Sequence, residues 1–137
     1  MRVLAIDHGE KRLGIAISDP TGTIARPLTV IQHTSRDADV AQVLALVQEY
    51  QVEWIVIGIS LDDQGQPNLA GRRALNFAQA LRERTHVPVE VWDEAFSTQE
   101  ARAARIQVGA RRKKRRGHLD EWAAAMILQS YLDAKKP

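Results

Sequence analysis

The sequence predicts an α/β fold with one five-stranded mixed sheet and helices on both of its faces. Its first residues form nearly continuous apolar runs, as expected for strands that are buried on both faces. From residue 34 onward, such runs alternate with segments whose apolar residues recur at helical spacing, a pattern typical of parallel strands joined by helices. With 137 residues, of which 45% are hydrophobic, the chain is expected to form one domain, residues 1–137, with a substantial core.

Three strands are predicted at the start of the chain. Residues 3–6 and 13–18 are apolar runs joined by a turn at Gly9, and residues 23–31 form a third run. Pro27 lies in the third run and favours an edge strand, because proline cannot donate a hydrogen bond to a neighbouring strand. The short connections predict a three-stranded meander.

Helices and strands are predicted to alternate in the middle of the chain. Residues 34–50 follow a Thr/Ser cap, and their apolar residues fall at i, i+3, i+4 and i+7: Val40, Val43, Leu44 and Val47. Residues 52–58 are expected to form a buried strand, and a loop over 60–68 leads to a second helix, residues 69–84. The apolar face of that helix would contain Ala74, Phe77, Ala78 and Leu81. Residues 87–92 are predicted to form the fifth strand.

The last part of the chain is predicted to be helical on both sides of a basic loop. The segment STQE, residues 97–100, is a capping-box pattern, and the helix that it opens should end at Gly109. A final helix is expected over residues 119–134. The alternation places the later strands parallel to the first strand, which is therefore expected to be central. Asp7 would then lie at the carboxyl end of a central strand, where α/β sheets bind ligands.

Composition excludes several classes of protein. The chain contains no cysteine, which excludes disulfides, thiol chemistry and cysteine-based metal sites. Its first residues lack the pattern of a signal peptide, and no apolar run approaches the roughly 18 residues of a membrane span. We therefore expect a cytoplasmic protein without a membrane partner.

Positive charge is concentrated in the last quarter of the chain. Residues 1–101 contain nine Lys/Arg and fourteen Asp/Glu, a net charge of −5, whereas residues 102–137 contain ten and three, a net charge of +7. Most of this surplus is one run of six cations: Arg111, Arg112, Lys113, Lys114, Arg115 and Arg116. Consecutive cations repel one another and favour a polyanionic partner, most often nucleic acid. A solvated basic loop without a partner is the alternative.

Acidic residues occur at three comparable positions. Asp7 ends the first predicted strand, Asp93 and Glu94 end the fifth, and Asp120 lies in the first turn of the last helix. Each could have an ordinary structural role, such as a helix cap. Converging carboxylates, however, would need a cation between them, and hard divalent ions take oxygen ligands. Acids beside a polycation favour metal-assisted cleavage of a phosphodiester. His8 and His118 lie next to these acids in the sequence. They could be metal ligands or proton carriers, or they could be ordinary polar loop residues.

Four blocks of sequence resemble the YqgF/RuvX family, the Holliday junction resolvase or pre-16S rRNA nuclease group. The blocks are LAIDHGEKRLGIAISDPTG, IVIGISL, VWDEAFST and RRKKRRGHLDEWAAAMILQSYLD, and they follow the family's order almost from end to end. The resemblance implies an RNase H-like fold and a nuclease that uses Mg²⁺ or Mn²⁺. It also implies a metal and catalytic site of Asp7, Glu94 and Asp120, phosphate contacts by Lys11 and Arg12, and close approach of substrate to the backbone at Gly9.

The chain departs from the family pattern at two places. Ala95 stands where the family usually has arginine after the Asp-Glu pair, and Ser60 stands in the family's Gly-x-Pro loop. Without that arginine, a phosphate clamp or a partner for the acids is absent. These departures bear on activity and substrate choice more than on fold.

The favoured function is cleavage of RNA in processing of the 16S ribosomal RNA precursor. The first alternative is a resolvase of branched DNA, which would act as a homodimer because it cuts two strands symmetrically; either a monomer or a homodimer is compatible with the sequence. The second alternative is a non-catalytic RNA-binding assembly factor, which would need the basic run but not the acids. A sugar-kinase or actin-type ATPase also begins with an Asp-x-Gly hairpin over phosphate. Such an enzyme needs two lobes of this kind, which one domain of this length cannot supply.

Overall fold

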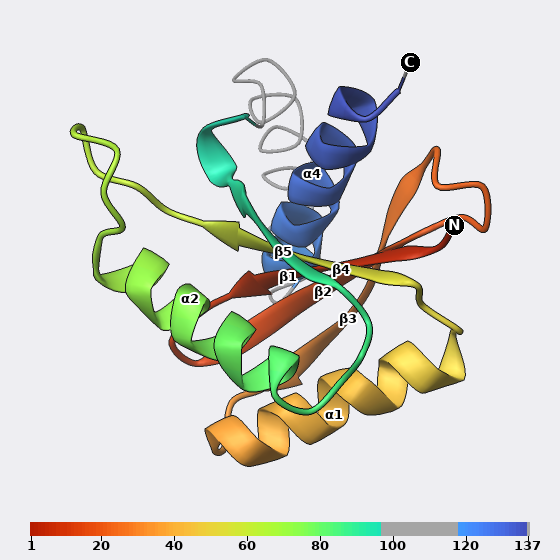
Figure 1. Ribbon diagram of the computed structural model, residues 1–137, viewed down its shortest axis with the longest axis horizontal. Helices are drawn as coiled ribbons and strands as arrows, with labels where there is room; N and C mark the ends of the chain where they lie inside the picture. The colour runs from red at the N-terminus through yellow and green to blue at the C-terminus, as the bar shows by residue number, and fades with distance from the viewer. Residues whose placement is uncertain (97–117, 137) are drawn as a thin grey trace.

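A computed structural model describes residues 1–96 and 118–136 (Figure 1). Its sheet has five strands in the order β3-β2-β1-β4-β5. The strands are β1 (Val3–His8), β2 (Arg12–Ser18), β3 (Ala25–Gln32), β4 (Trp54–Ile59) and β5 (Val89–Asp93). The helices are α1 (Arg36–Glu49), α2 (Leu69–Arg82) and α4 (His118–Ala134), with a short 3₁₀ helix, η1 (Glu94–Phe96), directly after β5. The predicted third helix and the basic run lie outside the described residues.

The topology confirms the predicted mixed sheet. Strands β1, β2 and β3 form an antiparallel meander, and β4 and β5 continue the sheet parallel to β1. Strand β1 is central and β3 is an edge strand, as Pro27 indicated. The register of β2 and β3 shifts between Ile15 and Ala16, next to the pairing of Ala16 with Pro27. An edge position tolerates proline because no further strand requires its missing N–H group.

Both faces of the sheet are covered, which explains the continuous apolar runs. Helices α1 and α2 lie on one face and α4 lies on the other (Figure 1). Alternate residues of β1 pack into two separate cores: Leu4 and Ile6 toward α1 and α2, Val3 and Ala5 toward α4. A strand that is buried on both faces needs apolar side chains at every position.

The helices begin where local sequence provides a cap. The Ser35 side chain accepts a hydrogen bond from the Ala38 N–H group and caps α1, and the Asn68 side chain accepts one from Gly71 and caps α2. Both caps satisfy a helix N–H group that has no partner within the helix. The residues predicted to face inward are buried in α2, and in α1 all are buried except Leu44, which is partly buried.

The inward side chains of α4 are small only near its start, and larger ones follow at Ile127, Leu128, Tyr131 and Leu132. Ala124 and Ala125 lie in the same core as Ala5 and Ala16 of the sheet. No helix in residues 1–96 and 118–136 is long and apolar enough to cross a membrane.

Candidate acidic site at the carboxyl end of the central strand

Asp7 lies near the carboxyl end of β1, on the face of the sheet that α4 covers. Side chains alternate along a strand, and Asp7 follows Val3 and Ala5, which both pack toward α4. Its register partner on β2 is Gly14. On its other side is Gly58 of β4, the residue after Ile57, which pairs with Ile6. Asp7 is therefore flanked by two residues that have no side chain.

Gly14 allows the first turn of α4 to rest on the sheet beside Asp7. A Cβ atom added to Gly14 would lie 2.0 Å from the carbonyl oxygen of Asp120 and 2.4 Å from its carbonyl carbon. Any side chain at this position would displace the start of the helix. The Asp120 carboxylate accepts a hydrogen bond of 2.8 Å at Oδ2 from the Arg12 Nε–H group. Asp120 is thus next to Asp7 through its backbone and is held by a residue of β2 through its side chain.

Gly58 has the equivalent role for Glu94 on the other side of Asp7. A Cβ atom added to Gly58 would lie 3.3 Å from Cγ of Glu94 and 2.5 Å from Cδ1 of Ile127 on α4. Glu94 therefore lies over β4 on the face that carries Asp7. Asp93 faces the other side of the sheet. It is two residues after Val91 on β5 and therefore on the same face as Val91, which packs toward α1 and α2. Its Oδ1 accepts a hydrogen bond of 2.9 Å from the Ala95 N–H group.

The three acidic residues thus occupy neighbouring positions in one row across the sheet. Adjacent strands lie about 4.8 Å apart, so the positions of Gly14 and Gly58 are roughly 10 Å apart, with Asp7 midway. Within the part of the chain that is described, no three His, Cys, Asp or Glu side chains are grouped closely enough to hold a metal ion. The donor type nevertheless fits Mg²⁺ or Mn²⁺, because these ions prefer carboxylate oxygens.

Arg12, Lys11 and Gly9 form the turn that leads away from Asp7. Arg12 is half exposed and binds Asp120, whereas the Lys11 side chain is exposed and its carbonyl group accepts from the His33 N–H group. The Gly9 N–H group donates to the Arg12 carbonyl group, and a Cβ atom on Gly9 would lie 2.5 Å from that oxygen. Gly9 is therefore required by the turn itself; close approach of substrate there stays a prediction.

His8 does not lie with the acids. It follows Asp7 on β1 and faces α2, with its ring centroid 4.9 Å from that of Phe77. Burial lowers the pKa of His8, and nearby His33 and Arg73 lower it further against the opposing effect of Asp39. The imidazole is therefore neutral at pH 7. The side chain of His118 and the six cations at 111–116 lie outside what the structure describes.

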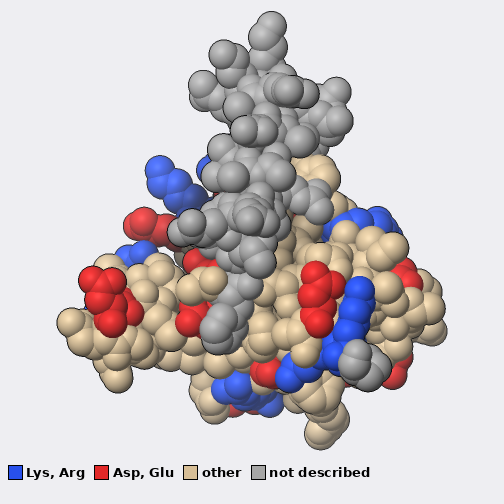
Figure 2. All heavy atoms as spheres, turned by 90° about the horizontal axis from the view of Figure 1, so that it is seen from above, with Lys and Arg blue, Asp and Glu red and all other residues tan. Residues whose placement is uncertain are grey.

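The visible described surface in Figure 2 has no continuous basic patch. Acidic and basic side chains are interspersed on that face. The predicted electrostatic contact of residues 111–116 with nucleic acid stays a prediction.

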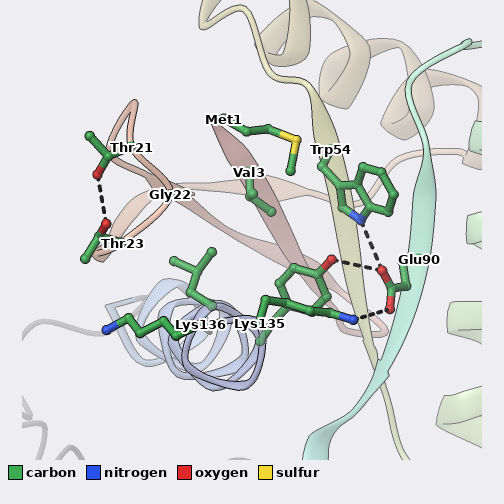
Figure 3. A pocket seen from close by; sticks show the side chains of 11 residues that line it. Met1, Val3, Thr21, Gly22, Thr23, Trp54, Glu90, Lys135 and Lys136 are labelled. Carbon is green, nitrogen blue, oxygen red and sulfur yellow. Dashed lines mark hydrogen bonds and ion pairs between the residues drawn. The ribbon is translucent and has the colours of Figure 1, made fainter.

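A cavity of about 530 Å³ lies at the opposite end of the α4 face (Figure 3). One wall contains Glu90, which accepts hydrogen bonds from Tyr131 Oη at 2.9 Å and from Trp54 Nε1 at 3.2 Å. Burial, and then the contact with Glu90, raises the pKa of Tyr131. The cavity reaches Val3, which is four residues from Asp7 along β1, or about 13 Å. It is therefore separate from the acidic row. Three tryptophans pack partly buried against the α4 core: Trp54, Trp92 and Trp122.

Sequence reasoning singled out the acids as candidates but did not identify the two glycines beside Asp7. Gly14 and Gly58 interrupt apolar strands, and a glycine inside a strand often marks close approach of another backbone. That signal was present in the sequence for both residues.

Comparison with known proteins gives consistent matches over the whole chain. A family model described as "RuvX: Holliday junction resolvase" matches residues 1–134. A protein of Anaeromyxobacter sp. (strain Fw109-5) is 40% identical over 135 residues, covering 98% of both chains. One of Syntrophus aciditrophicus (strain SB) is 42% identical over 134 residues, covering 98% of this chain and 89% of its own. Both are named "Putative pre-16S rRNA nuclease".

Solved structures confirm the predicted RNase H-like fold. T. thermophilus RuvC in complex with a Holliday junction substrate matches with a TM-score of 0.66 at 19% identity, covering 98% of this chain and 95% of its own. The fowlpox virus Holliday junction resolvase matches with a TM-score of 0.58 at 16% identity, covering 98% and 99%. At such identities the likeness concerns the fold.

Proposed function

The chain belongs to the RuvX (YqgF) family, and from that premise we propose that it cleaves RNA in the processing of the 16S ribosomal RNA precursor. Membership of this family makes the chain a nuclease, a hydrolase of phosphodiester bonds. The observation that carries the choice of RNA is the pair of relatives at 40% and 42% identity, whose names specify pre-16S rRNA. The sequence adds a physical argument: one short basic run and one set of acids suit a single flexible strand, which can bend into the site.

The RuvC-like fold generally uses divalent metal ions, and we propose Mg²⁺ or Mn²⁺ for this chain. Asp7, Glu94 and Asp120 would hold the ion through carboxylate oxygens. A bound ion of this kind polarises the phosphate and lowers the pKa of a bound water. The placement of all three residues on the α4 face, in one row, supports this assignment.

The chain's own residues hold and orient the acids. Asp7 is fixed by the central strand, and Glu94 is carried by η1 directly after β5. Arg12 orients Asp120 through the 2.8 Å hydrogen bond and offsets part of the repulsion among three carboxylates. The side-chain-free positions at Gly14 and Gly58 let α4 and Glu94 approach Asp7 from opposite sides.

Phosphate contacts are assigned to Lys11 and to the basic run, residues 111–116. Such contacts are insensitive to sequence and to the kind of base. The resemblance also predicts a phosphate contact for Arg12. Because its Nε–H group donates to Asp120, we assign Arg12 chiefly to positioning the Asp120 carboxylate.

Resolution of four-way DNA junctions is the second candidate, because the matching family model carries that description. It requires two sites held at a fixed separation by a two-fold dimer. A non-catalytic assembly factor is the third candidate and would bind RNA without cutting it.

The decisive experiment compares substrates, metals and two acid variants. Purified protein is incubated with single-stranded RNA, a structured 16S precursor fragment and a four-way DNA junction, each with Mg²⁺, Mn²⁺ or EDTA. Asp7→Asn should abolish metal-dependent RNA cleavage while leaving RNA binding intact. Asp93→Asn is the matched control, because it is the same substitution at an aspartate next to Glu94 that faces away from Asp7. Symmetric cleavage of the junction with intact RNA would replace the RNA assignment by the resolvase.

A further inference from the structure

A second cavity, of about 290 Å³, lies behind the acidic row on the other face of the sheet. It is at the same end of β1 as Asp7, because His8 follows Asp7 and points toward α1 and α2. The residues used below are His8 of β1, His33 after β3, Arg36 of α1, and Arg73 and Asn76 of α2. A ligand in this cavity would be one residue of β1 away from Asp7, with the sheet between them.

The floor of this cavity is aromatic and contains a buried nitrogen without a partner. The His8 ring packs on Phe77, which is only 2% exposed. The His8 Nδ1 atom is buried and makes no hydrogen bond within residues 1–96 and 118–136. Buried polar atoms in folded proteins nearly always have a partner, and an exception needs a physical explanation, such as strain, a catalytic role, or a bound water or ion.

The walls of the cavity offer donors that the protein itself leaves open. In the part of the chain that is described, the side chains of Arg36 and Asn76 line the cavity without a hydrogen bond or an ion pair of their own. Arg73 has one long contact, 3.9 Å from Nη1 to Oε2 of Glu10. Two guanidinium groups and an amide thus converge on one space.

The carboxylates near the cavity do not cancel this set of donors. Asp39 is fully buried, and both of its oxygens are used, one by His33 Nδ1 and one by the Thr34 N–H group. Asp39 therefore holds His33 at the cavity. Glu10 competes for Arg73, but its side chain is 75% exposed and its contact is long, so an anion can displace it.

We propose that this cavity binds a phosphate ester, supplied either by a free mononucleotide or by a nucleotide of an RNA strand. Guanidinium groups match phosphate oxygens in geometry and charge, and the partly buried ring of His8 offers an aromatic surface for a base. A strand with its scissile bond at Asp7 would reach the cavity by crossing the sheet edge at Gly9. The inference goes beyond the proposed function, because binding here requires neither metal nor cleavage.

The test measures binding in EDTA, where metal-dependent cleavage cannot occur. Backbone amide NMR spectra are recorded while inorganic phosphate, uridine 5′-monophosphate or a 12-nucleotide single-stranded RNA is added. Saturable shifts are expected at residues 8–10, 33–36 and 73–76. Arg36→Ala and Arg73→Ala should each weaken binding about tenfold or more, because each removes a charge-assisted hydrogen bond.

Two further variants make the test specific. Arg72→Ala removes the same charge from the neighbouring position of α2, outside the cavity, and should weaken binding less than about twofold. Glu10→Gln removes the competitor for Arg73 and should tighten binding, by up to about fivefold for an exposed ion pair. All four positions are exposed, so these variants are expected to fold.

The arms identify the source of the phosphate. If the mononucleotide or inorganic phosphate gives saturable shifts, the ligand of the cavity is a free phosphate compound. If only RNA shifts these amides, the ligand is a nucleotide within an RNA strand. The proposal is overturned if no arm shifts these amides, or if Arg72→Ala weakens binding as much as Arg73→Ala. Failure of the nuclease assignment would be seen separately, as absence of RNA cleavage with metal while binding here is retained.

Discussion

Replacement of Gly14 by alanine tests whether the start of α4 sets the geometry of the acids. The new Cβ atom would lie 2.0 Å from the Asp120 carbonyl oxygen, whereas Cβ contacts shorter than 3.0 Å are essentially absent from real structures. The obstacle is backbone, so no side-chain rotation relieves it. The first turn of α4 must therefore move by at least about 1 Å away from β2 and Asp7.

The expected effect on activity exceeds the effect on stability. Overpacking of this kind costs about 1–3 kcal/mol of unfolding free energy, which a folded domain tolerates. A displacement of about 1 Å at reacting groups can cost roughly 100-fold in rate. Unfolding in urea gives the first quantity, and metal-dependent cleavage of single-stranded RNA under single-turnover conditions gives the second.

Leu132→Ala is the control for lost stability without displacement of the site. Leu132 is buried near the far end of α4, and its truncation should cost about 2–5 kcal/mol without moving Asp120. We therefore expect Leu132→Ala to be the less stable but more active variant at a temperature where both are folded. If Gly14→Ala cleaves at the wild-type rate, or if activity follows stability in both variants, the start of α4 does not set the site.

Three further predictions concern the charged residues. Arg12→Gln should lower the cleavage rate by disordering Asp120 while changing the free energy of unfolding by less than about 1 kcal/mol, because the pair is partly exposed; an unchanged rate would contradict the positioning role. A second variant replaces four cations of the basic run by alanine: Arg112, Lys113, Lys114 and Arg115. It should weaken binding to all RNA sequences alike and reduce the slope of log affinity against log salt by up to about 3. Unchanged binding at low salt would refute the role of the run in binding. Hydrogen bonds from the Ile24 N–H group first, and then from Thr21 and Thr23, lower the pKa of Asp19 below its ordinary value of 3.8. The ionised Asp19 carboxylate therefore stabilises the fold above pH 3.8, and this stabilisation is lost as the pH falls through the lower pKa of the folded state. Asp19→Asn should accordingly lower the free energy of unfolding at pH 7 and lower it progressively less in acid. An equal loss at pH 7 and in acid would contradict this.

The strands were predictable because burial on both faces leaves a local trace. Residues 3–6 are apolar without interruption, and the structure places them alternately in the two cores. Pro27 predicted the edge for an equally local reason, its missing N–H group. The position of Asp7 at the end of the central strand followed from these two facts and the alternation of strands and helices.

The relations within the site were not predictable, because they join residues far apart in the chain. Arg12 and Asp120 are separated by 108 positions, and the contact of Asp120 with Gly14 depends on how α4 packs on the meander. No periodicity in either segment specifies the other. The family resemblance singled out Glu94, but the pattern of residues 87–94 alone did not separate it from Asp93, because that requires knowing which face of the sheet each residue of β5 occupies.

The placement of Glu94 and Asp120 in one row constrains the basic run through connectivity alone. The chain leaves this row at residue 94 and returns to it at residue 120, with the six cations in between. Arg116 precedes Asp120 by four residues and Arg111 precedes it by nine. We expect a phosphate that binds to the run to meet the acids at a raised effective concentration, because only three residues separate the run from Asp120.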